Sequence, residues 1–178
     1  ANLTKVGFFL PGPRAIVSGR GAPPPLPLPR GGRHCPLRFK KDAVSDSLTS
    51  TLTSYYDEVP YESHPFPQTA IEHLEALAFL FGLDAPPPAT ARVLELGCAA
   101  GGNLIPFAAR HPEATALGLD LSKVQVEQGV GAVSRAGLSN IELRAFNLAD
   151  VDASFGQFDY IVCHGVYSWV PGPVQDAI

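Results

Sequence analysis

The sequence predicts a doubly wound α/β fold built on a parallel sheet, and three observations predict it. Apolar runs of strand length alternate with segments of helix length from residue 92 onward, which is typical of parallel strands joined by helices. A glycine-rich turn over residues 97–102 directly follows the first apolar run. An acid, Asp120, ends the second apolar run, where nucleotide-binding sheets place a ribose acceptor, roughly 20 residues after the turn.

The totals of the chain favour one globular domain in a reducing compartment. Its 178 residues are 46% hydrophobic, enough to bury a single core, and no apolar stretch nears the ~18 residues of a membrane span. Cys35, Cys98 and Cys163 are far apart and odd in number, so neither a disulfide framework nor a metal site is predicted. We therefore expect a cytoplasmic protein with no membrane partner.

Charge divides the chain into two unlike parts. Residues 1–41 carry eight of the 13 basic residues and no acid, so all 17 acids lie in the remainder. Because the part that can fold is strongly acidic, no nucleic-acid partner is expected.

Residues 1–47 are basic, rich in proline and glycine, and have no helical or strand period. Three interpretations compete: a proline-rich tail that binds an acidic surface or an SH3-like groove, a transit peptide, and non-native coding sequence. The third is favoured because the chain contains no Met, and because only Ser18 precedes Ser45 whereas a transit peptide would be serine-rich. On any of the three we predict disorder.

Residues 48–89 are expected to lead into the sheet. The aromatic, proline-punctuated stretch 55–69 predicts an extended segment. A helix follows, opened by a capping box of Thr69 and Glu72 and closed by Gly82. Its buried stripe should comprise Ile71, Leu74, Leu77 or Ala78, and Phe81.

Residues 90–178 carry the alternation of strands and helices. A capping box of Ser122 and Gln125 opens the second helix of this part, and Gly137 ends it. The run 141–146 alternates apolar and polar residues, as an edge strand does, whereas 158–163 is almost continuously apolar, as a central strand is. In order, we expect strands at 93–96, 114–119, 141–146 and 158–163, helices at 103–110 and 123–136, with Val126, Val130 and Val133 on the buried face of the latter, and a helical turn after Pro171.

These assignments give the strand order 3-2-1-4. In such a sheet a ligand crevice opens beyond the carboxyl ends of the first and fourth strands, where the order reverses. The glycine turn 97–102 and the segment 163–169 should meet there.

Glu95, two residues before the turn, decides which ligand the turn suits. The turn matches a dinucleotide fingerprint with one Gly→Ala change, and Asp120 can accept ribose hydroxyls, so NAD is possible on these residues alone. A carboxylate at Glu95 would repel a pyrophosphate but would attract an ammonium group such as that of S-adenosylmethionine. The helix-start N–H groups can then bind the methionine carboxylate. The sequence therefore favours S-adenosylmethionine.

The motifs VLELGCAAGGN (93–103), Asp120 and FDYIVCHGVYSWV (158–170) resemble, in order, those of class I S-adenosylmethionine-dependent methyltransferases. SYYDEVPYESHPFPQT (54–69) and LAFLFGL (77–83) resemble the lead-in of one bacterial subfamily, which carries a methyltransferase regulatory domain after its catalytic core. The resemblance covers about residues 48–178. It implies a Rossmann-like sheet of seven strands, of which residues 90–178 supply four; the other strands and the regulatory domain would lie beyond Ile178.

The resemblance also implies roles for single residues. Glu95 would bind the methionine amine, directly or through water, and Asp120 the ribose. Leu121 would pack on the adenine, whose amine would donate to the side-chain oxygen of Asn147, with Asp150 as the alternative acceptor. Leu148 is a further cofactor-binding candidate. The loop beneath the cofactor would comprise Gly97, Cys98, Ala99 and Gly101.

Catalysis by such a protein is mainly alignment, because methyl transfer from a sulfonium is an in-line displacement. A base matters only if the acceptor arrives protonated. His164 and Tyr167, just past the fourth strand, are the best-placed candidates, and the alternative for His164 is a wall of the cofactor site. Trp169 is either a packing anchor or part of an acceptor pocket. Three tyrosines could cover the crevice: Tyr55, Tyr56 and Tyr61.

The acceptor stays open between a protein lysine and a small molecule, and the oligomeric state is unknown. As a fragment, the chain should bind cofactor weakly, turn over little, and leave an unpaired apolar edge on strand 158–163. Two other functions stay open: a nicotinamide-dependent oxidoreductase or epimerase, and a non-catalytic cofactor-binding module that uses its basic tail for contact.

Overall fold

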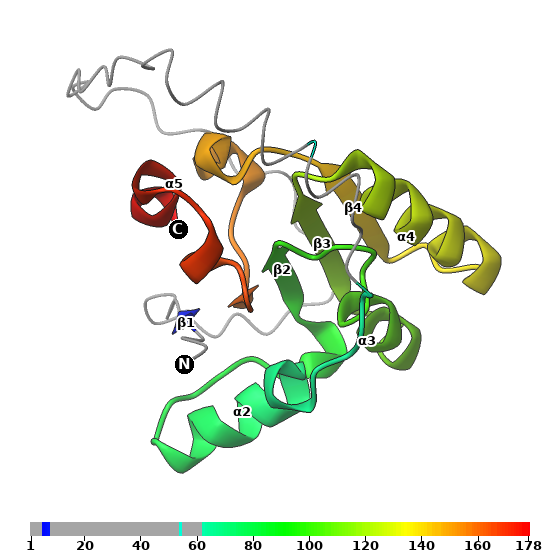
Figure 1. Ribbon diagram of the computed structural model, residues 1–178. Coiled ribbons are helices and arrows are strands. Elements are labelled where there is room, and N and C mark those ends of the chain that lie inside the picture. Colours follow the sequence, from blue (N-terminus) through cyan, green and yellow to red (C-terminus); the bar gives the residue numbers. More distant parts are fainter. Residues whose placement is uncertain (1–4, 8–53, 55–61) are drawn as a thin grey trace, which may run out of the picture.

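A computed structural model describes residues 5–7, 54 and 62–178 (Figure 1). The disorder predicted for residues 1–47 falls outside the described residues except at Lys5–Gly7. The proposed cover of Tyr55, Tyr56 and Tyr61 also falls outside them.

A central sheet has the strand order β1-β5-β2-β3-β4 (Figure 1). Four of its strands run parallel, with β2 paired to both β3 and β5 and β3 paired to β4, and the predicted order 3-2-1-4 is confirmed. These strands are β2 (Arg92–Leu96), β3 (Thr115–Asp120), β4 (Ile141–Ala145) and β5 (Tyr160–Cys163).

The outer edge of β5 is paired with β1 (Lys5–Gly7), which runs antiparallel to it with Val6 opposite Val162. The predicted unpaired edge is therefore wrong over these residues, and so is disorder at Lys5–Gly7. An open strand edge offers a row of free N–H and C=O groups, which an extended segment of the same chain can pair.

In the described part of the chain, four helices lie around the sheet. Of these, α4 begins and ends as predicted: the Gln125 N–H donates to Ser122 Oγ at 3.3 Å, and Gly137 ends the helix with a φ of 65°, a left-handed conformation that glycine adopts readily. The helices are α2 (Ile71–Leu80), α3 (Leu104–Arg110), α4 (Lys123–Ala136) and α5 (Gly172–Ala177).

The start of α2 differs from the prediction. Pro67–Thr69 forms a 3-10 turn, in which the Thr69 hydroxyl donates to the Phe66 carbonyl at 3.0 Å, so the expected capping box of Thr69 and Glu72 is wrong. The helix also ends at Leu80, which leaves Phe81 77% exposed instead of buried. The rest of the predicted stripe is buried at Ile71, Leu74 and Ala78.

The buried face of α4 differs at one position. Val126 is buried, but Val130 is 48% exposed. Gly129 takes the inward place, because a Cβ there would lie only 2.7 Å from the Ala100 carbonyl oxygen. The helix therefore approaches the glycine turn more closely than a valine would allow.

Side chains alternate across the sheet and build two cores. Val93 belongs to a core shared with α2, α3 and α4, whereas Leu94 and Leu96 belong to one shared with α5 and the segment after β4. By the same alternation Glu95 lies on the face of Val93, toward α3 and the segment that precedes the sheet. This segment, described over residues 62–89, is called the lead-in below.

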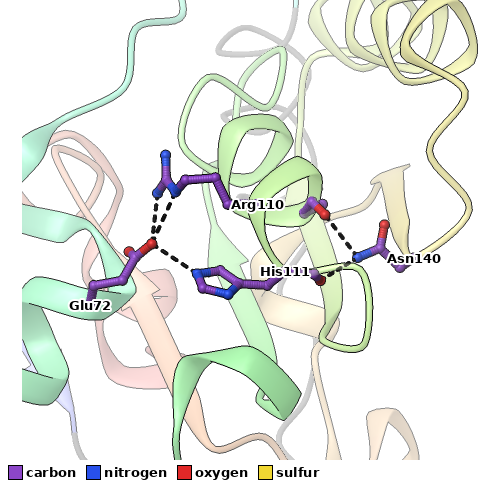
Figure 2. A network of polar contacts seen from close by, with 5 residues as sticks. Glu72, Arg110, His111 and Asn140 are labelled. Carbon is purple, nitrogen blue, oxygen red and sulfur yellow. Dashed lines mark hydrogen bonds and ion pairs between the residues drawn. The ribbon is translucent and has the colours of Figure 1, made fainter.

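A polar network fixes α2 against the end of α3 (Figure 2). Glu72 Oε1 accepts from Arg110 Nη2 and pairs with His111 Nε2, both at 2.9 Å. Asn140 Nδ2 donates to the carbonyls of Ala108, His111 and Ala114 at 3.1, 2.9 and 3.0 Å. These contacts tie the lead-in, the end of α3 and the approach to β4 together.

Within residues 62–178, each helix is too short or too polar to cross a bilayer.

Candidate functional site

A crevice of about 440 Å³ lies at the carboxyl ends of β2, β3 and β5. It opens where the strand order reverses, as predicted. Two candidates, Gly101 and Tyr167, are not among its lining residues. The predicted site residues that do line it are Glu95, Gly97, Cys98, Ala99, Asp120, Leu121, Asn147, Leu148 and His164.

The glycine turn is held in a conformation that brings its backbone to the crevice. Gly97 has a φ of 75°, and a Cβ there would lie 2.1 Å from Val166 Cγ2. Ala99 has a φ of 49°, which is a strained conformation for a residue with a Cβ. Gly101 has a φ of 79° and shapes the turn behind the crevice, where its carbonyl accepts from the Ile105 N–H at 2.9 Å.

Asp120 fastens this turn to the end of β3. Its Oδ2 accepts from the Ala99 N–H at 2.8 Å, and its Oδ1 accepts from the Ser122 N–H at 2.9 Å. A carboxylate has further lone pairs beyond these two. These two bonds fix the side chain in place beside the crevice.

Glu95 is 4% exposed, yet its carboxylate is only half satisfied. Oε1 accepts from Asn103 Nδ2 at 2.6 Å, whereas the buried Oε2 has no partner among the described residues. Burial raises the pKa of Glu95 to about 8; the Asn103 hydrogen bond lowers it, and the neighbouring Asp120 charge raises it. A cationic ligand in the crevice would supply both a partner and a counter-charge.

The two described cysteines are packing residues, as expected. Cys98 is buried against Gly118, where a Cβ would lie 2.7 Å from its sulfur. Burial and the nearby carboxylates of Glu95 and Asp120 raise the pKa of the Cys98 thiol, which leaves it protonated and unreactive. Cys163 is buried in the second core.

The leucines in the lining of the crevice suit a flat apolar group. These leucines are Leu121 and the buried Leu148. Asn147 Oδ1 accepts from the Ala149 N–H at 3.1 Å, and a second lone pair stays available to a ligand donor.

His164 lies at the mouth of the crevice against the lead-in. Its ring lies 4.4 Å from that of Phe66, and its Nε2 is 3.5 Å from Gln68 Nε2. Tyr167 begins a 3-10 turn, and its carbonyl accepts from Gln175 Nε2 at 2.7 Å. Of the two predicted base candidates, only His164 is therefore brought to the crevice.

Several lining residues were not predicted. The lead-in contributes Glu62, Ser63, His64 and Phe66, and the start of α3 contributes Asn103. Taken alone, the sequence around these residues predicts turns and helix caps. Their place in the crevice lining follows only from the fold, which brings them beside the glycine turn. Trp169, an open candidate in the sequence, also lines the crevice and is 65% exposed.

Comparison with known proteins identifies the family. The model of a methyltransferase domain matches residues 93–178. An uncharacterized protein of Rickettsia prowazekii is 55% identical over 132 residues, which cover 73% of this chain and 24% of that protein. Trans-aconitate 2-methyltransferase of Deinococcus radiodurans is 31% identical over 81 residues, covering 46% of this chain and 29% of the enzyme.

A solved structure agrees with these relatives. PKMT2 from Rickettsia typhi, in complex with AdoHcy, superposes with a TM-score of 0.64 at 48% identity, covering 66% of this chain and 23% of PKMT2. The chain thus spans between about a quarter and a third of the length of these three proteins. The nicotinamide-dependent alternative finds no support among them. Residues 93–178 thus form a methyltransferase domain of the class I family, which uses S-adenosylmethionine as its cofactor.

Proposed function

We propose that the crevice binds S-adenosylmethionine and that Glu95 receives its ammonium group. The observation that carries this proposal is the buried Oε2 of Glu95, which lines the crevice and has no described partner. A buried carboxylate oxygen without a partner is costly. An ammonium ligand would remove that cost, whereas a pyrophosphate would increase it.

The other lining residues fit the remaining parts of the cofactor. Asp120 would accept the ribose hydroxyls, because its carboxylate is held at the end of β3 by two backbone N–H groups. Leu121 and Leu148 would enclose the adenine, and Asn147 would accept from its amine. The turn at Gly97 and Ala99 would lie beneath the methionine portion.

We propose methyl transfer to an acceptor that enters at the mouth of the crevice. The bound cofactor would supply an electrophilic methyl group on a sulfonium. Phe66 and Trp169 would exclude water around the acceptor, and His164 would line its path, as a wall residue or as a base for a protonated acceptor. A protein lysine and a small molecule both remain proposals for the acceptor.

Calorimetry with S-adenosylhomocysteine and with NADH tests the cofactor assignment. We expect binding heat with S-adenosylhomocysteine and none with NADH. Glu95→Gln should lower the affinity for S-adenosylhomocysteine, because the variant cannot carry the counter-charge. Heat with NADH alone, or a Glu95→Gln chain that binds like the parent, would contradict the assignment.

We further propose that this chain binds cofactor but transfers methyl groups little by itself. The support is its coverage of only 23% of PKMT2. Incubation with S-adenosylmethionine carrying a labelled methyl group, with lysine-rich protein and small carboxylic acids as acceptors, measures this. Rapid transfer of label would overturn the proposal without affecting the binding assignment.

A further inference from the structure

Asn103 occupies the cap position of α3, yet its side chain does not cap the helix. An asparagine at such a position ordinarily accepts from an N–H of the first helical turn. Here both ends of the amide are used elsewhere. Nδ2 donates to Glu95 Oε1 at 2.6 Å, and Oδ1 accepts from the Phe66 N–H at 2.7 Å.

These two bonds join parts of the chain that local structure does not connect. Glu95 lies at the end of β2, and Phe66 lies in the lead-in 37 residues before Asn103. Next to it, the Gly102 N–H donates to Ser63 Oγ at 2.8 Å, and a Cβ on Gly102 would lie 2.8 Å from the His64 nitrogen. The lead-in thus contacts the end of the glycine turn at Gly102.

Asn103 also lies between two cavities. Glu95, Asn103 and Phe66 line both the crevice and a second cavity of about 230 Å³, bounded by the lead-in and α3. The hydrogen bond from Asn103 therefore holds the Glu95 carboxylate where the two cavities meet.

We propose that Asn103 is a positioning residue that couples cofactor binding to the lead-in: one end of its amide holds Glu95 toward the ammonium site, and the other holds Phe66 over the crevice. This inference rests on the proposed function, because it presumes that an ammonium ligand binds at Glu95. It adds that filling this site and seating the lead-in stabilise each other.

The coupling predicts a distinctive pH dependence. Ammonium binding requires an ionised Glu95, and the Asn103 hydrogen bond opposes the upward effect of burial on the pKa of that group. Loss of the amide should therefore move the rise in affinity to higher pH. The other titratable or charged groups around Glu95 are Cys98 and Asp120 at the turn, Arg110 across the second cavity, and Glu62, His64 and His164 at the mouth.

The experiment compares two ligands on the 178-residue chain and its Asn103→Ala variant. S-adenosylhomocysteine carries the ammonium group, whereas 5′-methylthioadenosine lacks the amino-acid half. At pH 7 we expect the variant to lose about 10- to 100-fold in affinity for S-adenosylhomocysteine and about twofold or less for 5′-methylthioadenosine. Between pH 6 and 9 its affinity for S-adenosylhomocysteine should rise at higher pH than in the parent.

Hydrogen exchange tests the second bond of the amide, in which Asn103 Oδ1 accepts from the Phe66 N–H. S-adenosylhomocysteine should slow exchange of the Phe66 N–H in the parent but not in Asn103→Ala. Asn103→Asp keeps an acceptor for that N–H, so protection should persist while the pH curve departs from the parental one. Ser63→Ala is the matched control: it removes a neighbouring lead-in bond without touching Glu95, so its pH curve should keep the parental midpoint.

The outcomes separate the two proposals. A parent chain that binds neither ligand overturns the proposed function and this inference with it. A parent that binds S-adenosylhomocysteine, with an Asn103→Ala variant that loses both ligands equally and keeps the parental pH curve, overturns only the inference. Circular dichroism of each variant identifies a chain that has simply failed to fold, in which case the Asn103→Asp data decide.

Discussion

The Ala99 N–H donates to Oδ2 of Asp120 at 2.8 Å. The acid at the end of β3 therefore has a structural partner in the same turn that a cofactor would rest on. The bond also helps to hold Ala99 at its positive φ, a conformation that an alanine does not adopt without support from its surroundings. Stability of the turn and affinity for a ribose should thus change together when Asp120 is altered.

Asp120→Asn should weaken both properties. One side-chain oxygen remains, but the new NH₂ group faces a backbone N–H, so we expect a loss of about 1–3 kcal/mol in the free energy of unfolding. Urea denaturation measures that loss, and calorimetry with S-adenosylhomocysteine measures the accompanying fall in affinity. Asp152→Asn is the control, because Asp152 accepts from the Ser154 N–H in an exposed turn outside the crevice. Unchanged affinity in Asp120→Asn would contradict the ribose role.

Gly97→Ala should be much more damaging than Gly137→Ala. Both glycines have positive φ. A Cβ at Gly97 would lie 2.1 Å from Val166 Cγ2, whereas a Cβ at Gly137 would have no heavy atom within 4 Å among the described residues, its own chain neighbours and helix backbone aside. Backbone strain alone costs about 1 kcal/mol. At Gly97 the steric overlap should add roughly 1–3 kcal/mol and displace Val166 from the crevice wall. Thermal denaturation of the two variants provides the comparison, and equal losses would show that Val166 moves aside freely.

The empty chain should become less stable as the pH rises. The folded state keeps a proton on Glu95 up to a pKa of about 8, whereas the unfolded chain releases it near the ordinary value of 4.5. This contribution to stability is complete below pH 4.5, decreases as the pH rises, and is gone above about 8. The decrease is at most about 1.4 kcal/mol per pH unit.

Urea unfolding of the parent and of Glu95→Gln from pH 5 to 9 measures this dependence. The difference between the two chains isolates Glu95 from the other titrating groups. We expect the parent to lose stability relative to the variant as the pH rises. A constant difference would mean that Glu95 is ionised throughout that range.

Asn140→Ala should destabilise the fold without altering the crevice. Its Nδ2 donates to three carbonyls around the end of α3, and their loss should cost about 2–4 kcal/mol. Asn140→Asp should be at least as harmful, because a carboxylate would face the same carbonyl oxygens. Denaturation midpoints test both variants. A drop in cofactor affinity measured well below the midpoint would contradict the separation of this network from the site.

The strand order could be predicted because it depends on patterns within short windows. The alternation at 141–146 and the apolar run at 158–163 identify an edge and a central strand. The right-handedness of connections between parallel strands then restricts the order in which the strands can lie. β1 could not be predicted, since a three-residue strand has no period. The start of α2 was missed because Thr69 serves a 3-10 turn instead of the helix.

The candidate site divides in the same way. Glu95 and Asp120 follow from their spacing to the glycine turn. Asn103 does not, because a helix-start asparagine ordinarily caps its own helix, and its bond to Phe66 spans 37 residues. Whether Tyr167 takes part in catalysis stays a prediction, although it is not among the residues that line the crevice.

Trp169 gives the crevice an optical reporter of its own. It is the only tryptophan of the chain, and it lines the crevice while 65% of its surface is in contact with solvent. A ligand that covers the indole should shift its emission to shorter wavelength, because the excited state is then less relaxed by water. Occupancy of the crevice can therefore be followed by fluorescence in the unlabelled chain, because all of its tryptophan emission comes from a residue that lines the crevice.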